Sequence, residues 1–158
     1  QVANTTTETS IFGAGIGGRT LPSDFLVIGK DIDIKMSGVY STVAVTGDTV
    51  TFRIKYGSTT LATKATTALV IGGTDLYWKL NLKITCRTEG PTGTVQVSGS
   101  LEYQTAGNVM VCNEINNAVA TSTLDTTTSN LLDITVQHSA ANASNSIKSL
   151  VGSLTINN

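Results

Sequence analysis

His138 is the only histidine in the chain, so acid–base or metal chemistry near neutral pH must use it or manage without imidazole. The residue is in phase with Ile134 and Val136 at the end of an alternating stretch. A nucleophilic set of Ser139, His138 and Asp133 is disfavoured, because Asp133 points to the opposite face of that strand. We therefore interpret His138 as a residue at a sheet rim, and we expect no catalytic residues.

The two cysteines and one pair of aspartates are the other candidates for binding chemistry. Cys86 and Cys112 are too few for a disulfide framework, and with a single histidine they give no zinc spacing. Cys86 is in phase with inward residues, so we expect a buried thiol; a Cys86–Cys112 bridge is the alternative. Asp31 and Asp33 share one strand face and could bind calcium weakly, but such pairs usually form a solvated face. We expect no metal and no cofactor.

Residues 13–18 read Gly-Ala-Gly-Ile-Gly-Gly and match the GxGxxG pattern of dinucleotide-binding turns. Such a turn must open a helix within a βαβ unit, because the helix N-terminus receives the pyrophosphate. Residues 19–23 read Arg-Thr-Leu-Pro-Ser and start no amphipathic helix. We therefore interpret the segment as a glycine-rich surface loop and not as a nucleotide site.

Five cations are predicted to point outward, and they would form a basic stripe if their strands share one sheet. They are Arg53, Lys55, Lys79, Lys83 and Arg87. On that face only Tyr77 is available to stack on bases, and a net charge of −1 gives no field that attracts nucleic acid. We expect no nucleic-acid partner, and we assign Lys79, Lys83 and Arg87 to a candidate subunit-contact face.

The composition is typical of an all-β protein. Charged residues make up 13% of the 158 residues, against about 25% in average soluble proteins. Threonine and serine, about a quarter of the chain, take their place, and β-branched threonine suits the wet face of a pleated sheet. The longest apolar run, residues 68–71, is far shorter than the ~20 residues that span a bilayer. We expect no membrane insertion.

Residues 76–103 carry the clearest strand pattern. Apolar side chains occupy every second position from Leu76 to Cys86, and alternation resumes from Val95 to Tyr103. Between these two stretches, residues 88–93 supply the glycines and the proline of a turn. The segment is predicted to be an antiparallel hairpin with one buried face and one wet face.

Alternation and turn signals predict strands along most of the remaining chain, and no helical period is sustained over ten residues. The polar residues 121–130 are predicted to form a long surface loop. The other predicted strands cover residues 5–12, 25–40 with a break at 29–30, 50–63 as a hairpin, 69–71, 109–112, 132–136, and 147–156 with one bulge.

Eight or nine strands in one compact chain predict an all-β fold, an antiparallel two-sheet sandwich of the jelly-roll kind. Residues 1–158 would form a single domain, with residues 1–9 as an extended N-terminal arm or linker. An immunoglobulin-like sandwich is the competing fold. It lacks support because Trp78 precedes both cysteines, so the order Cys, Trp, Cys is missing.

Three stretches of the sequence resemble virion proteins of tailed bacteriophages. They are ANTTTETSIF at residues 3–12, IDIKMSGVYS at 32–41, and DITVQHSAANASNSI at 133–147, the last followed by a short closing strand. The three stretches are spread from the N-terminal to the C-terminal part of the chain. The resemblance extends to fibre and spike tips as well as to head decoration proteins, so it indicates a phage particle without fixing the place on it.

The resemblance implies a non-enzymatic structural protein, a trimeric jelly roll on the outside of a virion. A tail-fibre or spike tip would bind host glycan through loops at residues 13–23 and 119–130. A decoration or cement protein would instead clamp capsid subunits, with residues 1–9 as a strap. Its partners would be its own copies and other capsid or tail proteins. The candidate contact residues in or beside the loops are Gly15, Arg19, Asp24, Ser122, Asp125 and Asn130.

A carbohydrate-binding module of a secreted bacterial glycan-degrading enzyme is the alternative function. Such a module predicts a face with two or three exposed aromatic residues. Aromatic residues make up only 5% of this chain, and most of them are in phase with core positions. A glycosidase needs two carboxylates across a cleft, and the 11 scattered acidic residues reveal no such pair.

Overall fold

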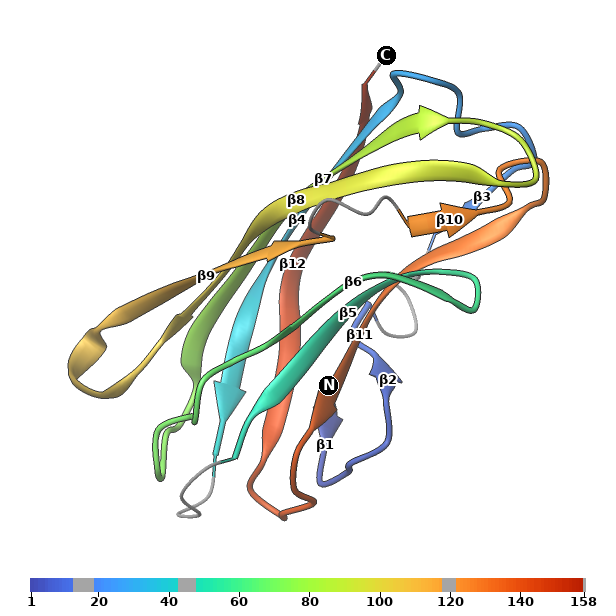
Figure 1. Ribbon diagram of the computed structural model, residues 1–158. Helices are drawn as coiled ribbons and strands as arrows, with labels where there is room; N and C mark the ends of the chain where they lie inside the picture. The colour runs from blue at the N-terminus through green and yellow to red at the C-terminus, as the bar shows by residue number, and fades with distance from the viewer. Residues whose placement is uncertain (13–18, 43–47, 118–121, 158) are drawn as a thin grey trace.

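The computed structural model describes residues 1–12, 19–42, 48–117 and 122–157, with the side chain of Ser122 excepted. Two antiparallel sheets, A and B, pack face to face over these residues (Figure 1). The predicted all-β, two-sheet antiparallel sandwich is therefore confirmed. No helix in the described part of the chain is long and apolar enough to cross a membrane.

Sheet A runs in the order β1-β12-β4-β7-β8-β10, with β9 also paired to β8, and sheet B runs β2-β11-β5-β6, with β3 also paired to β11. The strands of sheet A are β1 (Val2–Ala3), β4 (Asp31–Ser41), β7 (Leu76–Thr88), β8 (Gly93–Gln104), β9 (Met110–Asn116), β10 (Ser122–Leu124) and β12 (Ser146–Asn157). The strands of sheet B are β2 (Thr9–Ser10), β3 (Arg19–Leu21), β5 (Val50–Tyr56), β6 (Thr59–Ala65) and β11 (Asn130–His138), and one 3-10 turn, η1, covers Ala106–Asn108.

The predicted hairpin at residues 76–103 is confirmed as β7 and β8, which are joined by a tight turn and pair along most of their length. Its inward residues are buried, and Trp78 is only 1% exposed. The predicted hairpin at residues 50–63 is confirmed as β5 and β6. Alternation located both hairpins because each has one side in the core and the other in water.

The chain closes on itself through nested strand pairs. β4 pairs with β12, and β5 pairs with β11, so the last two long strands return beside the first two. These nested antiparallel pairs agree with the predicted jelly roll. In contrast, β7, β8 and β9 follow one another in a single sheet. More strands form than the eight or nine predicted, because β1, β2, β3 and β10 are too short to show a period.

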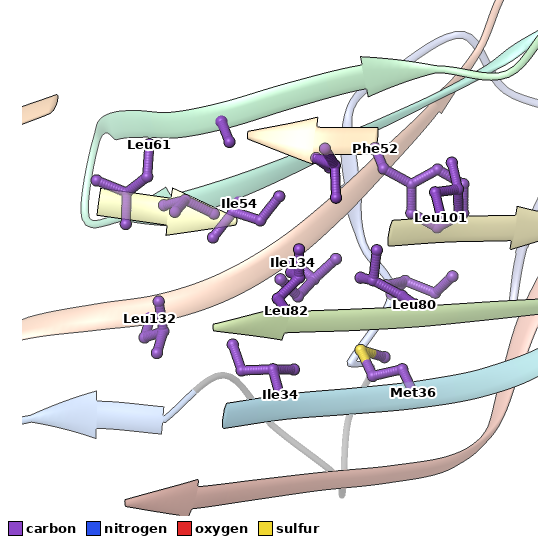
Figure 2. Packing of buried hydrophobic residues seen from close by; sticks show 14 of the residues in the cluster. Ile34, Met36, Phe52, Ile54, Leu61, Leu80, Leu82, Leu101, Leu132 and Ile134 are labelled. Atoms are coloured by element: carbon purple, nitrogen blue, oxygen red, sulfur yellow. The ribbon is translucent and has the colours of Figure 1, made fainter. Parts of the chain in front are cut away.

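The core fills the space between the sheets, and Figure 2 shows part of it. Phe52 of sheet B lies against Trp78 of sheet A, with ring centroids 5.4 Å apart and planes tilted by 55°, a favourable aromatic geometry. Leu82 from sheet A and Ile134 from sheet B meet at the centre of the view (Figure 2). Burial of these alternating side chains holds the two layers together.

Several local predictions were wrong. Residues 5–12 contribute only β2, residues 25–30 form turns, and residues 69–71 form no strand. Leu69 is nevertheless buried, and its N–H donates to Asp48 O at 2.8 Å. The polar run 121–130 contains β10, which pairs with β8. Short segments such as these follow tertiary contacts and carry no period of their own.

Residues 1–9, expected as an extended arm or linker, lie against the sandwich in this chain. β1 pairs with β12 in sheet A, and β2 pairs with β11 in sheet B, so the segment crosses from one layer to the other (Figure 1). Val2 is buried, and Gln137 Nε2 donates to Thr6 O at 2.8 Å. The segment therefore closes one open side of the sandwich.

Both cysteines are free thiols, which excludes the alternative Cys86–Cys112 bridge. Cys86 is buried, as predicted, and its Sγ lies 3.5 Å from the carbonyl oxygens of Leu26 and Thr88. Burial raises the pKa of the Cys86 thiol, and the charge of Glu89 adds to this effect. Cys86 therefore acts as a small core residue, while Cys112 is exposed on β9.

Candidate functional site

Three segments far apart in the sequence meet at one end of the sandwich. We call this region the loop end and define it as residues 21–27, 88–93 and 124–130. The N–H of Asp24 donates to Thr126 O at 2.9 Å, and the N–H of Thr126 donates to Gly90 O at 3.0 Å. Loops that a rigid sandwich holds in place in this way commonly carry binding sites.

Thr126 is the centre of the loop end and is only 1% exposed. Its Oγ1 accepts a hydrogen bond from Gly90 N at 2.8 Å. Its methyl carbon lies so close to Gly93 that a Cβ added there would be 2.7 Å away. The β7–β8 turn and the β10–β11 loop are thus fastened to each other, with no room for a larger residue at Gly93.

The loop end contains a surface pocket with a volume of about 280 Å³. Its wall combines two carboxylates, threonine hydroxyls and an aliphatic side, which suits a small ligand rich in hydroxyl groups. The lining residues are Asp24, Leu26, Val27, Glu89, Gly90, Thr126 and Thr127. Among the described residues, no protein group bonds or pairs with the carboxylates of Asp24 and Glu89, which leaves both available to a ligand.

The structure brings four of the six predicted contact residues to the same end, in different roles. Arg19 and Asp24 are exposed, Arg19 in β3 and Asp24 in the following turn. Asp125 Oδ1 accepts hydrogen bonds from Thr127 N (2.9 Å) and Oγ1 (2.6 Å), so it shapes its own loop. Asn130 Nδ2 donates to Thr128 Oγ1 at 2.9 Å and is likewise a loop-forming residue.

Two predicted contact residues have no described side chain. Ser122 begins β10, opposite Val95 of β8, and Gly15 lies outside the described residues together with the whole GxGxxG segment. Glu89 and Thr126 complete the pocket; Thr126 lies in the predicted loop 119–130 without having been named as a contact residue, and Glu89 was missed. Glu89 could have been identified as a pocket residue from its place in the β7–β8 turn, because that turn lies at the same end of the sandwich as residues 22–27.

The second candidate region is the outward side of sheet A, which we call the outer face. Its residues lie in five cross-strand rows over β12, β4, β7, β8 and β9, and the register places Lys79 between Ser37 and Glu102. The rows are Lys148-Val39-Tyr77-Gln104-Met110, Val151-Ser37-Lys79-Glu102-Cys112, Ser153-Lys35-Asn81-Ser100-Glu114, Thr155-Asp33-Lys83-Ser98-Asn116 and Asn157-Asp31-Thr85-Gln96.

The charges of the outer face are balanced within the face. Lys83 Nζ lies 3.0 Å from Asp31 Oδ2 and 3.3 Å from Asp33 Oδ1, and Lys79 Nζ lies 3.6 Å from Glu102 Oε2. Across the five rows four lysines face four carboxylates, so the net charge is zero. Such exposed pairs add little stability, but they leave a face that does not repel its own copy.

One end of the outer face is apolar. Exposed Tyr77 and Met110 belong to its first row, and exposed Val151 lies in the second row beside the bulge residue Leu150. Toward the other end, the surface is hollowed beside Gly99, where a pocket of about 220 Å³ lies against Asn81 and Lys83. Arg87, the third predicted contact residue, is exposed beyond these rows near the end of β7.

The five outward cations form no basic stripe, because their strands do not share one sheet. Arg53 and Lys55 belong to β5 of sheet B, whereas the other three cations belong to β7 of sheet A. Glu8 lies over β5, with Oε1 3.1 Å from Lys55 Nζ and Oε2 3.6 Å from Arg53 Nη1. A hydrogen bond from Thr135 to Glu8 lowers the pKa of this carboxyl, and Lys55 and Arg53 lower it further against the opposing effect of burial.

His138 and its neighbours form a buried polar cluster near the other end of β11. Ser139 Oγ donates to Asp48 Oδ1 at 2.5 Å, and Asn145 Nδ2 donates to the second carboxylate oxygen. His138 is 1% exposed, and neither ring nitrogen has a hydrogen-bond partner among the described residues. A nucleophilic set would require a hydrogen bond from the Ser139 hydroxyl to the imidazole. In this structure the hydroxyl is instead bound to a carboxylate.

Asp31 and Asp33 share one face, as predicted, but they point toward Lys83. Thr85 Oγ1 also donates to Asp31 Oδ1 at 2.5 Å, and the two contacts together lower the pKa of this carboxyl. In the ranges that the structure describes, no three His, Cys, Asp or Glu side chains gather where they could hold a metal ion. The pair thus belongs to the charge balance of the outer face.

Comparison with protein families, with curated proteins and with solved structures finds no significant match for this chain.

Proposed function

We propose that this protein is a non-enzymatic structural protein of a bacteriophage particle, a homotrimer on the virion surface. Its copies would meet through the outer face of sheet A, and its loop end would contact the partner. If the protein is a tail-fibre or spike tip, this partner is a host-surface glycan. If it is a decoration protein, the partner is the capsid. The proposal combines the resemblance of three sequence stretches to phage virion proteins with the geometry of these two regions.

The observation that carries the proposal is that predicted contact residues from distant parts of the chain meet at one end of the sandwich. Asp24 is a predicted contact residue, Thr126 lies in the predicted loop 119–130, and a backbone hydrogen bond joins them. Within one pocket of about 280 Å³, Asp24 and Glu89 offer carboxylates and Thr127 offers a hydroxyl. Carboxylates accept hydrogen bonds from sugar hydroxyls, so the wall suits a neutral glycan.

The outer face supports assembly from identical copies. It is broad, its charges cancel, and it ends in exposed apolar side chains that include Tyr77 and Met110. Interfaces between copies have few unpaired charges at the centre and are enriched in tyrosine and methionine. Contact through this face would leave the loop end accessible on each copy, because the face lies along the strands and the loops lie at their ends.

The carbohydrate-binding module gains no support from the aromatic residues. All eight lie within the described parts of the chain, and Tyr77 is the only one with an exposed side chain. Phe25, at the loop end, is half-buried under Lys30, whose Nζ lies 4.3 Å from the ring centroid. Two or three exposed rings on one face, which stacking on a sugar chain requires, are therefore lacking in this structure.

Binding to host envelopes and to capsids tests the role of the loop end. The double variant Asp24→Asn/Glu89→Gln removes both pocket carboxylates with little change in shape. Its matched control is Asp75→Asn, because Asp24 and Asp75 are both exposed and have left-handed backbones, with φ of 56° and 49°. Asp75 precedes β7, at the opposite end from Glu89.

We expect the wild-type chain and Asp75→Asn to bind host-envelope glycans in a glycan array or to bind purified capsids. The double variant should lose at least tenfold in affinity, about 1.4 kcal/mol, since two charge-assisted contacts are removed. Glycan binding identifies a fibre or spike tip, and capsid binding identifies a decoration protein. Binding to neither target, or equal binding by the double variant, would reject the assigned role of the loop end.

A further inference from the structure

β12 is the edge of sheet A for most of its length. On one side it pairs with β4 throughout, and on the other side β1 covers only Ser146 and Ile147. No other strand in the described parts of the chain pairs with residues 148–157 on that side. Since the backbone groups of a strand point alternately to its two sides, half of the N–H and C=O groups in this stretch face outward.

This edge lacks most of the features that keep exposed edges from pairing. Residues 149–157 contain no charged residue and no proline, and only the bulge between Ser149 and Val151 interrupts the strand. Two of the other outer strands carry charges, with Glu114 in β9 and Lys64 in β6, and the uncharged outer strands β10 and β2 are only three and two residues long. Natural proteins usually protect long edges with lysine, proline or a covering segment. β12 is thus the edge best suited to accept another strand.

The side chains of the edge are also incompletely covered. Leu150 is 59% and Val151 is 64% exposed. Leu154 and Ile156 are in register with the fully buried Ile34 and Ile32 of β4, yet both remain half-buried. Sheet B therefore stops short of β12, and apolar surface on both sides of the strand stays open to a neighbour.

We propose that the free edge of β12 pairs with the β12 edge of a second copy of this chain, antiparallel and about a two-fold axis. Sheet A of one copy then continues into sheet A of the other. Self-pairing brings no like charges together, because residues 149–157 are uncharged. The same patch on both copies satisfies the outward backbone groups of both strands, as an isologous contact requires. This contact goes beyond the proposed three-fold assembly and uses a different surface.

Sedimentation equilibrium and hydrogen exchange of the purified chain test this contact. The edge variant Leu150→Lys/Ile156→Lys places charge on the edge without altering any position in the five rows of the outer face. The matched control Ile71→Lys/Val109→Lys places the same two charges on exposed apolar residues away from β12. Circular dichroism checks that each variant remains folded, and Leu150→Lys alone serves if the double variant unfolds.

We expect assemblies of the wild-type chain and of the control to contain two copies, or six if the trimer also forms. Assemblies of the edge variant should contain half as many. Amide exchange of residues 149–157 should become at least tenfold faster in the edge variant. Three copies in the wild type would overturn the edge contact while supporting the proposed trimer. A single copy, or an edge variant of unchanged mass and exchange rate, would also overturn it.

Discussion

The residue type of His138 suggested acid–base chemistry, but its buried position indicates an effect on the stability of the fold. It is buried at the end of β11 with no hydrogen bond to either ring nitrogen, since the nearby Val2 backbone makes none of normal geometry. Burial lowers the pKa of the imidazole from 6.5, and the charge of Asp48 only partly opposes this. The side chain is therefore neutral in the folded protein near neutral pH.

This lowered pKa predicts that the protein loses stability in mild acid. The unfolded chain binds a proton near pH 6.5, while the folded chain resists protonation, so the free energy of unfolding rises with pH in this window and falls as pH drops below 6.5. One such group contributes at most about 1.4 kcal/mol per pH unit. Thermal unfolding between pH 7.5 and 5 should show the loss, and His138→Leu should reduce it.

The carboxylates that also affect acid stability act at lower pH. The pKa values of Glu8 and Asp31 are lowered from 4.5 and 3.8, so the stability that they contribute is present above those values and is lost below them. The loss of stability that His138 causes therefore occurs in a separate pH range, above that of the carboxylates. If His138→Leu and wild type lose stability equally between pH 6.5 and 5, the buried imidazole is not its cause.

At this scale the sequence could predict which residues are buried, but not which residues meet. Alternation placed Cys86 in the core and Asp133 on the face opposite His138, and both predictions are confirmed. It could not show that Asp48 bonds Ser139 or that Glu8 pairs with Arg53, because these contacts join segments about 90 and 45 residues apart. Such pairs depend on the topology of the sheets.

The β12 bulge is the clearest case of an element that sequence and structure explain together. Ile147 is out of phase with the later apolar residues, which predicted one bulge, and the register shift between Ser149 and Val151 confirms it. At the bulge, the Lys148 carbonyl oxygen accepts a hydrogen bond from the buried Trp78 indole at 3.1 Å. A Cβ at Gly38 would lie 1.9 Å from that oxygen, so only glycine fits there.

Gly38→Ala should therefore destabilise the protein by about 1–3 kcal/mol, because the β12 backbone must move or the Trp78 hydrogen bond must lengthen. Urea unfolding followed by Trp78 fluorescence measures both the stability and the indole environment. The control Ser98→Ala changes an exposed residue of the same sheet and should shift stability by less than about 0.5 kcal/mol. Equal shifts for the two variants would contradict this role of Gly38.

Element prediction succeeded where a strand is long and one of its faces is wet. β4, β5, β7, β8, β11 and the second half of β12 all follow a period of two. The assignment of strands to sheets had no such signal, so the sequence could not show whether β5 and β7 share a sheet, as a basic stripe required. β10 and β3 were missed since each takes its place through pairing with a longer strand.

At the scale of the whole molecule, the sandwich separates three surfaces with different properties. The loop end has a pocket with two unpaired carboxylates among the described residues, the outer face is neutral with an apolar end, and the β12 edge is uncharged. Low overall charge, 13% of residues, fits a protein that packs against its own copies. Assembly of the chain through the outer face is therefore the central property to be tested.

The most direct test is the molar mass of the purified chain by light scattering, compared with the variant Ser98→Arg/Ser153→Arg. Both serines are exposed in the rows of the outer face, so arginine there would clash in an interface without disturbing the fold. The exposed turn residue Ser58, changed to arginine, is the control in sheet B. We predict three times the 16.4 kDa of one chain, or six times with edge pairing, for wild type and control. The outer-face variant should fall to one or two copies, whereas a wild-type mass of one or two chains, or a variant mass equal to that of the wild type, would contradict the account.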